Sequence, residues 1–188
     1  MLPAAVDRNE RIGPCNEGQL RPGHDVVRRR LVRILFRKIS DERHTLEIVR
    51  EDGRREQVEC ETRSYLVHDL LHYAVESEAG VQGGFWGNLG QGKTLVDMND
   101  RTGRAMASVA PEMAVIERLV GSLSAVVKGR TAAEMVAALD QYAAALGSTN
   151  PDWLTEPFVL AVQERMRQLL GRWRATPYGS TMELDWCP

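Results

Sequence analysis

Cysteine is scarce in this sequence, and long apolar runs are missing from it. Its three cysteines, Cys15, Cys60 and Cys187, are far apart and odd in number, so they indicate no disulfide framework. No apolar run approaches the ~20 residues that a membrane-spanning helix needs. The initial Met-Leu-Pro is followed by charged residues rather than by the apolar stretch of a secretory signal. These absences favour a cytoplasmic protein that does not enter a membrane.

An excess of basic charge is also missing. The chain has 24 Lys and Arg against 26 Asp and Glu, a net charge of −2, which argues against a dedicated nucleic-acid-binding protein. Arginine greatly outnumbers lysine, which indicates a GC-rich coding bias, and the chain resembles a bacterial protein in this respect. With 188 residues, 43% hydrophobic and 27% charged, it is typical of one globular domain.

Local composition divides the chain into three parts. Residues 1–24 mix proline, glycine and charge without any period, so we predict a flexible N-terminal arm. Residues 25–176 are predicted to form a single α+β domain. Residues 177–188 begin at Pro177, which is expected to end the last helix, and are left as a C-terminal tail without assigned structure.

The period of the apolar residues changes near Thr62. Before it, short runs rich in β-branched residues alternate with charges, as at Leu46 and Ile48, and Asp52-Gly53 is a strong hairpin signal. After it, apolar residues recur every three or four positions, as they do in helices. The predicted fold class is therefore α+β: a short antiparallel β-meander of three strands followed by a helical C-terminal part.

The last long helix, expected at about residues 155–174, carries a continuous apolar stripe. Its members are Phe158, Val162, Met166, Leu169 and Trp173. Such a stripe either covers the sheet or forms the seam of a homodimer, and the sequence leaves both open.

Residues 62–80 carry the best indication of function. Ser64 can cap a helix, Gly80 can end it, and no proline interrupts it. His68, His72 and Glu76 follow one another at intervals of one turn and form one stripe. Two imidazoles and a carboxylate in this arrangement can bind Zn²⁺ or Fe²⁺, with water in an open position. We therefore predict a divalent-metal site at these three residues.

Acidic neighbours would supply the chemistry at such a site. A divalent ion lowers the pKa of its bound water, so Asp69 or Glu78 is expected to act as base in a hydrolysis or elimination. His44 and Cys60 are further candidates to approach from the strands. Histidines beside an apolar face also serve as ordinary hydrogen-bonding residues, so the sequence is also compatible with a protein that binds no metal.

The metal-free alternative is a non-catalytic protein-interaction or regulatory module. It is supported by large apolar residues in the C-terminal part that exceed what one small core requires. These residues are Trp153, Phe158, Trp173 and Trp186. They would face a protein partner or a second copy of the chain.

Residues 87–94 match the phosphate-binding pattern G-x-x-x-x-G-K-[ST]. That loop must follow a buried parallel strand and start a helix. Here a predicted helix and a turn-like Gly-rich stretch precede it, so we do not expect a P-loop NTPase. The glycines suit a tight backbone around Phe85 and Trp86.

The run His68-Asp69-Leu70-Leu71-His72 resembles the H-D-x-x-H segment of the Coq4-type ubiquinone-biosynthesis proteins, a helical family with an attributed zinc site. The resemblance implies a zinc site at the two histidines. The family has a glutamate twelve positions after the second histidine, where this chain has Gly84. The acids available here are Glu76 and Glu78. The resemblance covers only these five residues, and the strands have no counterpart in that family.

Overall fold

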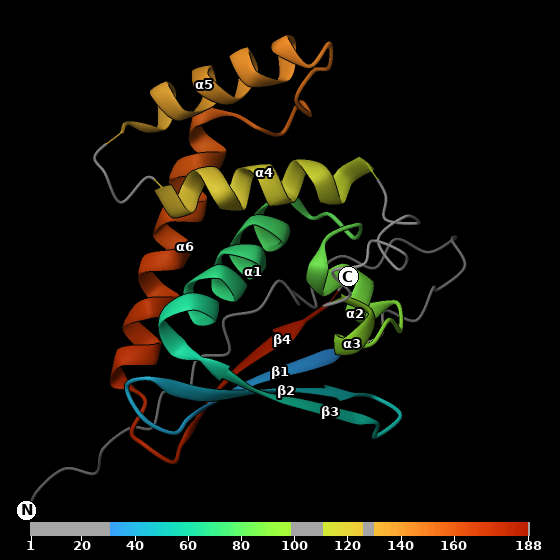
Figure 1. The fold of residues 1–188 in the computed structure, drawn as a ribbon, viewed down its shortest axis with the longest axis vertical. Helices are drawn as coiled ribbons and strands as arrows, with labels where there is room; N and C mark the ends of the chain where they lie inside the picture. Colours follow the sequence, from blue (N-terminus) through green and yellow to red (C-terminus); the bar gives the residue numbers. More distant parts are fainter. Residues whose placement is uncertain (1–30, 99–110, 126–129, 188) are drawn as a thin grey trace, which may run out of the picture.

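The computed structural model describes residues 31–98, 111–125 and 130–187, so the predicted N-terminal arm lies outside the described residues. A four-stranded antiparallel sheet forms one layer, and helices cover one of its faces (Figure 1). This arrangement confirms the predicted α+β fold class. Within the described part of the chain, none of the helices is both long and apolar enough to cross a membrane.

The sheet contains the predicted meander and one further strand. Its strands are β1 (Val32–Lys38), β2 (Arg43–Arg50), β3 (Arg55–Glu61) and β4 (Thr181–Trp186), in the spatial order β3-β2-β1-β4. Ile34 at the centre of β1 pairs with Ile48 of β2 and Leu184 of β4, and all three side chains are buried. The alternation of apolar and polar residues thus directs one face of the sheet towards the helices.

Strand β4 comes from the segment that the sequence analysis left as a tail. Met182 and Leu184 are buried, whereas Thr181 and Glu183 are exposed, which is the period-two pattern of a half-buried strand. The pattern is short, and its hydrogen-bonding partner β1 lies almost at the other end of the chain. Next to β4, Cys187 is disulfide-bonded, which the cysteine spacing did not predict, while Cys60 is a free cysteine.

The helical part begins directly after β3. A π-helical turn, η1 (Thr62–Leu66), continues into α1 (Val67–Ala79), which ends at Gly80 with a φ of 64° in the left-handed region. The remaining helices are α2 (Phe85–Gly90), α3 (Leu95–Met98), α4 (Pro111–Ala125), α5 (Ala132–Ala145) and α6 (Glu156–Ala175). The predicted capping box of Thr131 and Glu134 is present at the start of α5.

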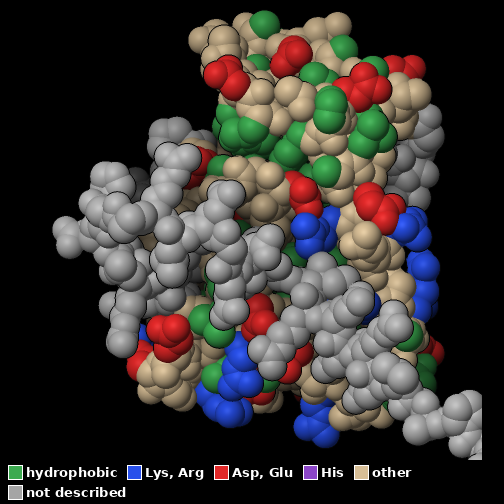
Figure 2. All heavy atoms as spheres, turned by 180° about the vertical axis from the view of Figure 1, so that it is seen from behind, with side chains coloured by type: hydrophobic (Ala, Val, Ile, Leu, Met, Phe, Trp, Pro, Cys, Tyr) green, Lys and Arg blue, Asp and Glu red, His purple; other side chains and the backbone are tan. Residues whose placement is uncertain are grey.

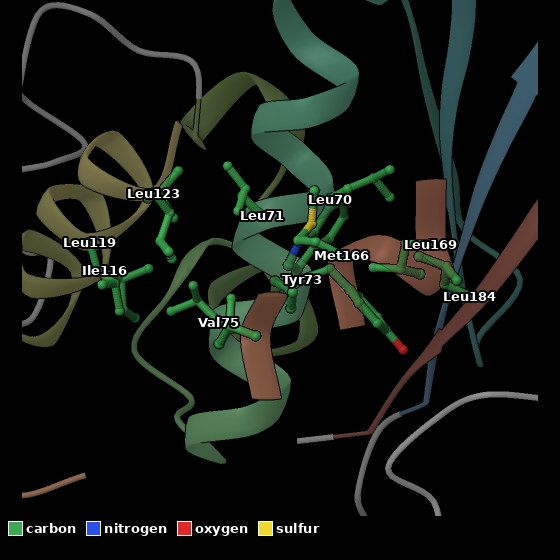
Figure 3. Packing of buried hydrophobic residues seen from close by; sticks show 14 of the residues in the cluster. Leu70, Leu71, Tyr73, Val75, Ile116, Leu119, Leu123, Met166, Leu169 and Leu184 are labelled. Carbon is green, nitrogen blue, oxygen red and sulfur yellow. The ribbon is translucent and has the colours of Figure 1, made fainter. Parts of the chain in front are cut away.

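The core lies where α1 packs against α4, α6 and the sheet. Figure 3 shows side chains of α1 between those of α4 and α6, with Leu184 of the sheet beyond Leu169. The whole predicted stripe of α6 is buried, as is Trp186 of β4. The stripe is therefore part of the core of this chain, and most of the large apolar residues assigned to a partner surface are internal.

The end of the molecule that carries α5 is different. Figure 2 shows apolar side chains gathered there, in the upper part of that view. Tyr142 of α5, Leu146 at the C-terminal cap of α5 and Leu160 of α6 are each more than half exposed. Helix α5 packs on α6 and buries Met135, Leu139 and Ala143, whereas Tyr142 of the same helix is exposed.

The segment with the phosphate-loop pattern does not follow a strand. Helix α1 precedes it, Gly87 and Gly90 lie inside α2, and Lys93 and Thr94 connect α2 to α3. Arg50 of β2 donates hydrogen bonds to the backbone carbonyl oxygens of Leu89 and Lys93. The segment is thereby attached to the C-terminal end of strand β2.

Candidate metal site between helices α1 and α4

Two histidines of α1 and a glutamate of α4 form one group. His68 and His72 lie on successive turns with ring centroids 4.7 Å apart. Glu117 faces both from α4: its Oε1 lies 3.3 Å from His72 Nε2, and its Oε2 lies 4.0 Å from His68 Nε2. One possible ligand atom from each residue lies within 4.8 Å of the others. The facing helices thus bring together the donor set His, His, Glu.

His72 is the buried member of the group. Its side chain is 1% exposed, and its Nδ1 lies 3.2 Å from Glu76 Oε1. The other nitrogen, Nε2, is close to Glu117 but not in hydrogen-bond geometry with it, and it has no other hydrogen-bond partner. A buried polar atom without a partner is costly, so this nitrogen requires an explanation.

Electrostatics around His72 favour a positive charge. Burial lowers its pKa, but the nearby carboxylates of Glu117 and Glu76 outweigh burial and raise the pKa to about 9. In turn, the contact with His72 lowers the pKa of Glu117, despite partial burial. The space between the two carboxylates therefore attracts either a proton on His72 or a bound cation.

Glu76 lies on the opposite side of His72 from Glu117. Its carboxylate is fully buried and accepts hydrogen bonds from the backbone N–H groups of Phe85 (2.8 Å), Trp86 (2.9 Å) and Gly87 (3.2 Å). Burial raises the pKa of Glu76, and the His72 contact and these amides act against that rise. The residue that the spacing predicts as third ligand is thus outside the histidine–carboxylate group, and Glu117 belongs to it instead.

The two predicted bases lie in different places. Asp69 Oδ1 is 3.5 Å from His68 Nδ1, on the ring nitrogen that does not face Glu117. Glu78 forms an ion pair with Arg165 of α6, with a shortest distance of 2.6 Å. Six residues after His72, or about 600° along a helix, Glu78 points to another side of α1. Asp69 therefore borders the site, whereas Glu78 lies at the α1–α6 contact.

His44 and Cys60 are neighbours in the sheet rather than members of the group. They are paired across β2 and β3, and His44 Nδ1 lies 3.2 Å from the Thr62 hydroxyl. Burial lowers the pKa of His44, and burial also raises the pKa of the Cys60 thiol to about 11. Both environments favour neutral side chains.

Sequence reasoning did not find Glu117. The only local signal is its position beside the buried Ile116 on a helix that also buries Met113 and Val120. An acidic residue at the edge of an apolar face is common and does not by itself indicate a ligand. Its relation to the histidines arises from the packing of α4 on α1.

The three side chains could hold a metal ion. Zinc binds imidazole nitrogen and carboxylate oxygen at about 2.0–2.2 Å, which places two tetrahedral ligand atoms roughly 3.3 Å apart. The contact between His72 and Glu117 already has this length, and the contact between His68 and Glu117 is slightly longer. His68 and Glu117 are 46% and 42% exposed in their side chains, so one side of the group is open to solvent.

Comparison with protein-family models, with curated proteins and with solved structures found no match. The functional argument therefore depends on the site itself.

Proposed function

We propose that this protein binds a divalent transition-metal ion, Zn²⁺ or Fe²⁺, through His68, His72 and Glu117. The observation that carries the proposal is His72 Nε2, which is buried, lacks a hydrogen-bond partner and lies 3.3 Å from a Glu117 carboxylate oxygen. A metal ion between the two atoms would be bound by the lone pair of His72 Nε2 and by the Glu117 carboxylate oxygen.

The donor types support this class of ion. Two imidazoles and one carboxylate suit Zn²⁺ and Fe²⁺, whereas Mg²⁺ and Ca²⁺ prefer sites made of oxygen atoms alone. Three protein ligands leave a fourth position on the solvent side. Water or an oxygen atom of a substrate would take that position, where the ion would act as a Lewis acid.

The test is metal binding by protein purified without a histidine tag. We expect about one equivalent of Zn²⁺ or Fe²⁺, measured by elemental analysis and by titration against a chelator of known affinity. Because loss of a residue that merely orients a ligand already costs 10–100-fold, His68→Gln and Glu117→Gln should each weaken binding by roughly 100-fold or more. Both side chains are partly exposed, so these variants should fold.

Glu78→Gln is the matched control, because Glu78 is on the same helix but bonded to Arg165. It should bind metal as the unsubstituted protein does. An unsubstituted protein that binds neither ion, or a Glu117→Gln variant with unchanged affinity, would overturn the proposal.

A metal-free protein-interaction module is the second candidate. The apolar side chains gathered at the α5 end of the molecule in Figure 2 favour it, because large apolar side chains on a surface are typical of a contact site. Tyr142, Leu146 and Leu160 are large apolar residues that are more than half exposed. The same metal analysis separates the two candidates: a protein without bound metal, even after incubation with Zn²⁺ or Fe²⁺, would support the module.

A further inference from the structure

We infer that the Gly-rich run at residues 83–87 is a backbone cradle for the carboxylate of Glu76, and that Glu76 positions His72 as a metal ligand. The inference rests on the proposed function for its second half. The cradle overlaps the phosphate-loop pattern of residues 87–94 only at Gly87. The anion that this backbone binds belongs to the chain itself.

The hydrogen bonds of Glu76 support the cradle. Oε1 accepts from Phe85 N at 2.8 Å and lies 3.2 Å from His72 Nδ1, while Oε2 accepts from Trp86 N at 2.9 Å and Gly87 N at 3.2 Å. Each oxygen thus has two partners. A carboxylate that is 0% exposed needs such partners, because its charge would otherwise be buried without compensation.

Glycines at the entrance to the cradle leave room for two carboxylates. A Cβ atom at position 84 would lie 2.2 Å from the Glu76 carboxyl carbon, and one at position 83 would lie 2.2 Å from Glu112 Oε2. Gly83 N also donates to that Glu112 oxygen at 2.7 Å, so a second carboxylate, from α4, fixes the same turn. Asn88 closes the turn through its side-chain amide, which donates to the carbonyl oxygens of Gly83 and Gly84.

The cradle has a chemical consequence for His72. An ionised carboxylate can only accept hydrogen bonds, so the ring nitrogen beside it, Nδ1, must carry a hydrogen. The neutral ring then keeps its lone pair on Nε2, the atom that faces Glu117. Ligating histidines commonly donate their second ring N–H to a carboxylate in this way. Glu76 is therefore a positioning residue that does not itself touch the ion.

Glu76→Gln tests this role with little change of shape. If the amide oxygen stays on Trp86 and Gly87, the NH₂ group faces His72 Nδ1 and donates to it. His72 would then carry its hydrogen on Nε2 and lose the lone pair required for metal binding. The reverse orientation would leave two backbone N–H groups facing an NH₂ group, which is less favourable.

The experiment compares Glu76→Gln with the control Glu78→Gln. We expect Glu76→Gln to weaken Zn²⁺ binding by about 10–100-fold and Glu78→Gln to leave it unchanged. In the zinc-loaded unsubstituted protein, ¹⁵N NMR of the imidazole should show His72 bound through Nε2, with a hydrogen on Nδ1. A purely structural role for Glu76 would not determine which nitrogen binds.

Two results would overturn the inference: zinc bound through Nδ1 in the unsubstituted protein, or unchanged zinc affinity in a folded Glu76→Gln variant. The NMR result requires no variant, so a Glu76→Gln protein that fails to fold does not prevent the test.

The cradle itself is tested without metal. In the metal-free protein, Glu76→Gln should raise the unfolding equilibrium constant at least about tenfold over that of Glu78→Gln. Equal constants would overturn the cradle. A protein that binds neither Zn²⁺ nor Fe²⁺ but shows this difference would refute the proposed function and leave the cradle intact.

Discussion

His72 and His44 are both buried imidazoles whose Nε2 has no hydrogen-bond partner. The groups around the two rings nevertheless differ: carboxylates surround His72, whereas a hydroxyl and aromatic rings surround His44. His72 has a carboxylate near each ring nitrogen, from Glu76 and Glu117. His44 has the Thr62 hydroxyl near Nδ1, and its ring contacts Phe36 and Trp173 with centroid distances of 6.0 and 5.9 Å.

The pKa values of the two histidines move in opposite directions. Burial lowers the pKa of His44, and the charge of Asp69 does not reverse this. For His72, Glu117 and Glu76 reverse the effect of burial and raise the pKa to about 9. Burial alone thus produces a neutral core histidine. Carboxylates beside both ring nitrogens, Glu76 from the same helix and Glu117 from α4, instead favour a positive charge at His72.

The largest expected effect comes from removing the carboxylate that distinguishes His72 from His44. Glu76→Leu leaves three backbone N–H groups and His72 without their acceptor, so unfolding should become easier by about 3–5 kcal/mol. Chemical denaturation of metal-free protein measures this loss. Glu78→Leu, which removes a partly exposed ion pair, should cost about 1 kcal/mol or less. Similar losses for both variants would show that the Glu76 cradle has no special importance for stability.

The second expected effect is that the contributions of His72 and His44 to folding stability change in opposite directions with pH. The folded-state pKa of His72 is raised from 6.5 to about 9, so its contribution is complete below pH 6.5 and is lost as pH rises through about 9. The folded-state pKa of His44 is lowered, so its contribution is present above pH 6.5 and is lost as pH falls.

Denaturation of metal-free protein between pH 5 and pH 10 checks these signs, with His72→Gln and His44→Gln as the two variants. The stability difference between unsubstituted protein and His72→Gln should shrink by up to about 3 kcal/mol as pH rises. The corresponding difference for His44→Gln should shrink as pH falls. Slopes of the same sign for both variants would contradict the comparison.

The smallest expected effect is that of His44→Phe. The variant keeps a ring of similar size between Phe36 and Trp173, removes the unpartnered Nε2 and loses the contact with Thr62. These changes act in opposite directions, so stability should change by no more than about 1 kcal/mol. Zinc affinity, measured by chelator competition, should not change. A large loss of affinity would mean that His44 contributes to the metal site.

Local patterns predicted the parts of the fold that depend on neighbouring residues. The stripe of α6 from Phe158 to Trp173 and the capping box at Thr131 follow from helix geometry within a few turns. The hairpin at Gly53 follows from a φ of 82°, which glycine adopts without strain. Strand β4 was missed because six alternating residues become a strand only when β1, distant in sequence, offers hydrogen bonds.

In the candidate site, too, some features follow from local sequence and others from tertiary structure. The sequence alone determined that His68 and His72 share one side of a helix, because residues four apart always do. It also determined that Glu76 would lie near His72, and the two side chains are in contact. Tertiary structure decided which nitrogen each acid would face. The amides of α2 bind the Glu76 carboxylate on the Nδ1 side, and the packing of α4 on α1 brings Glu117 to Nε2. Spacing along one helix cannot encode these choices, because they depend on donors and acceptors carried by other elements.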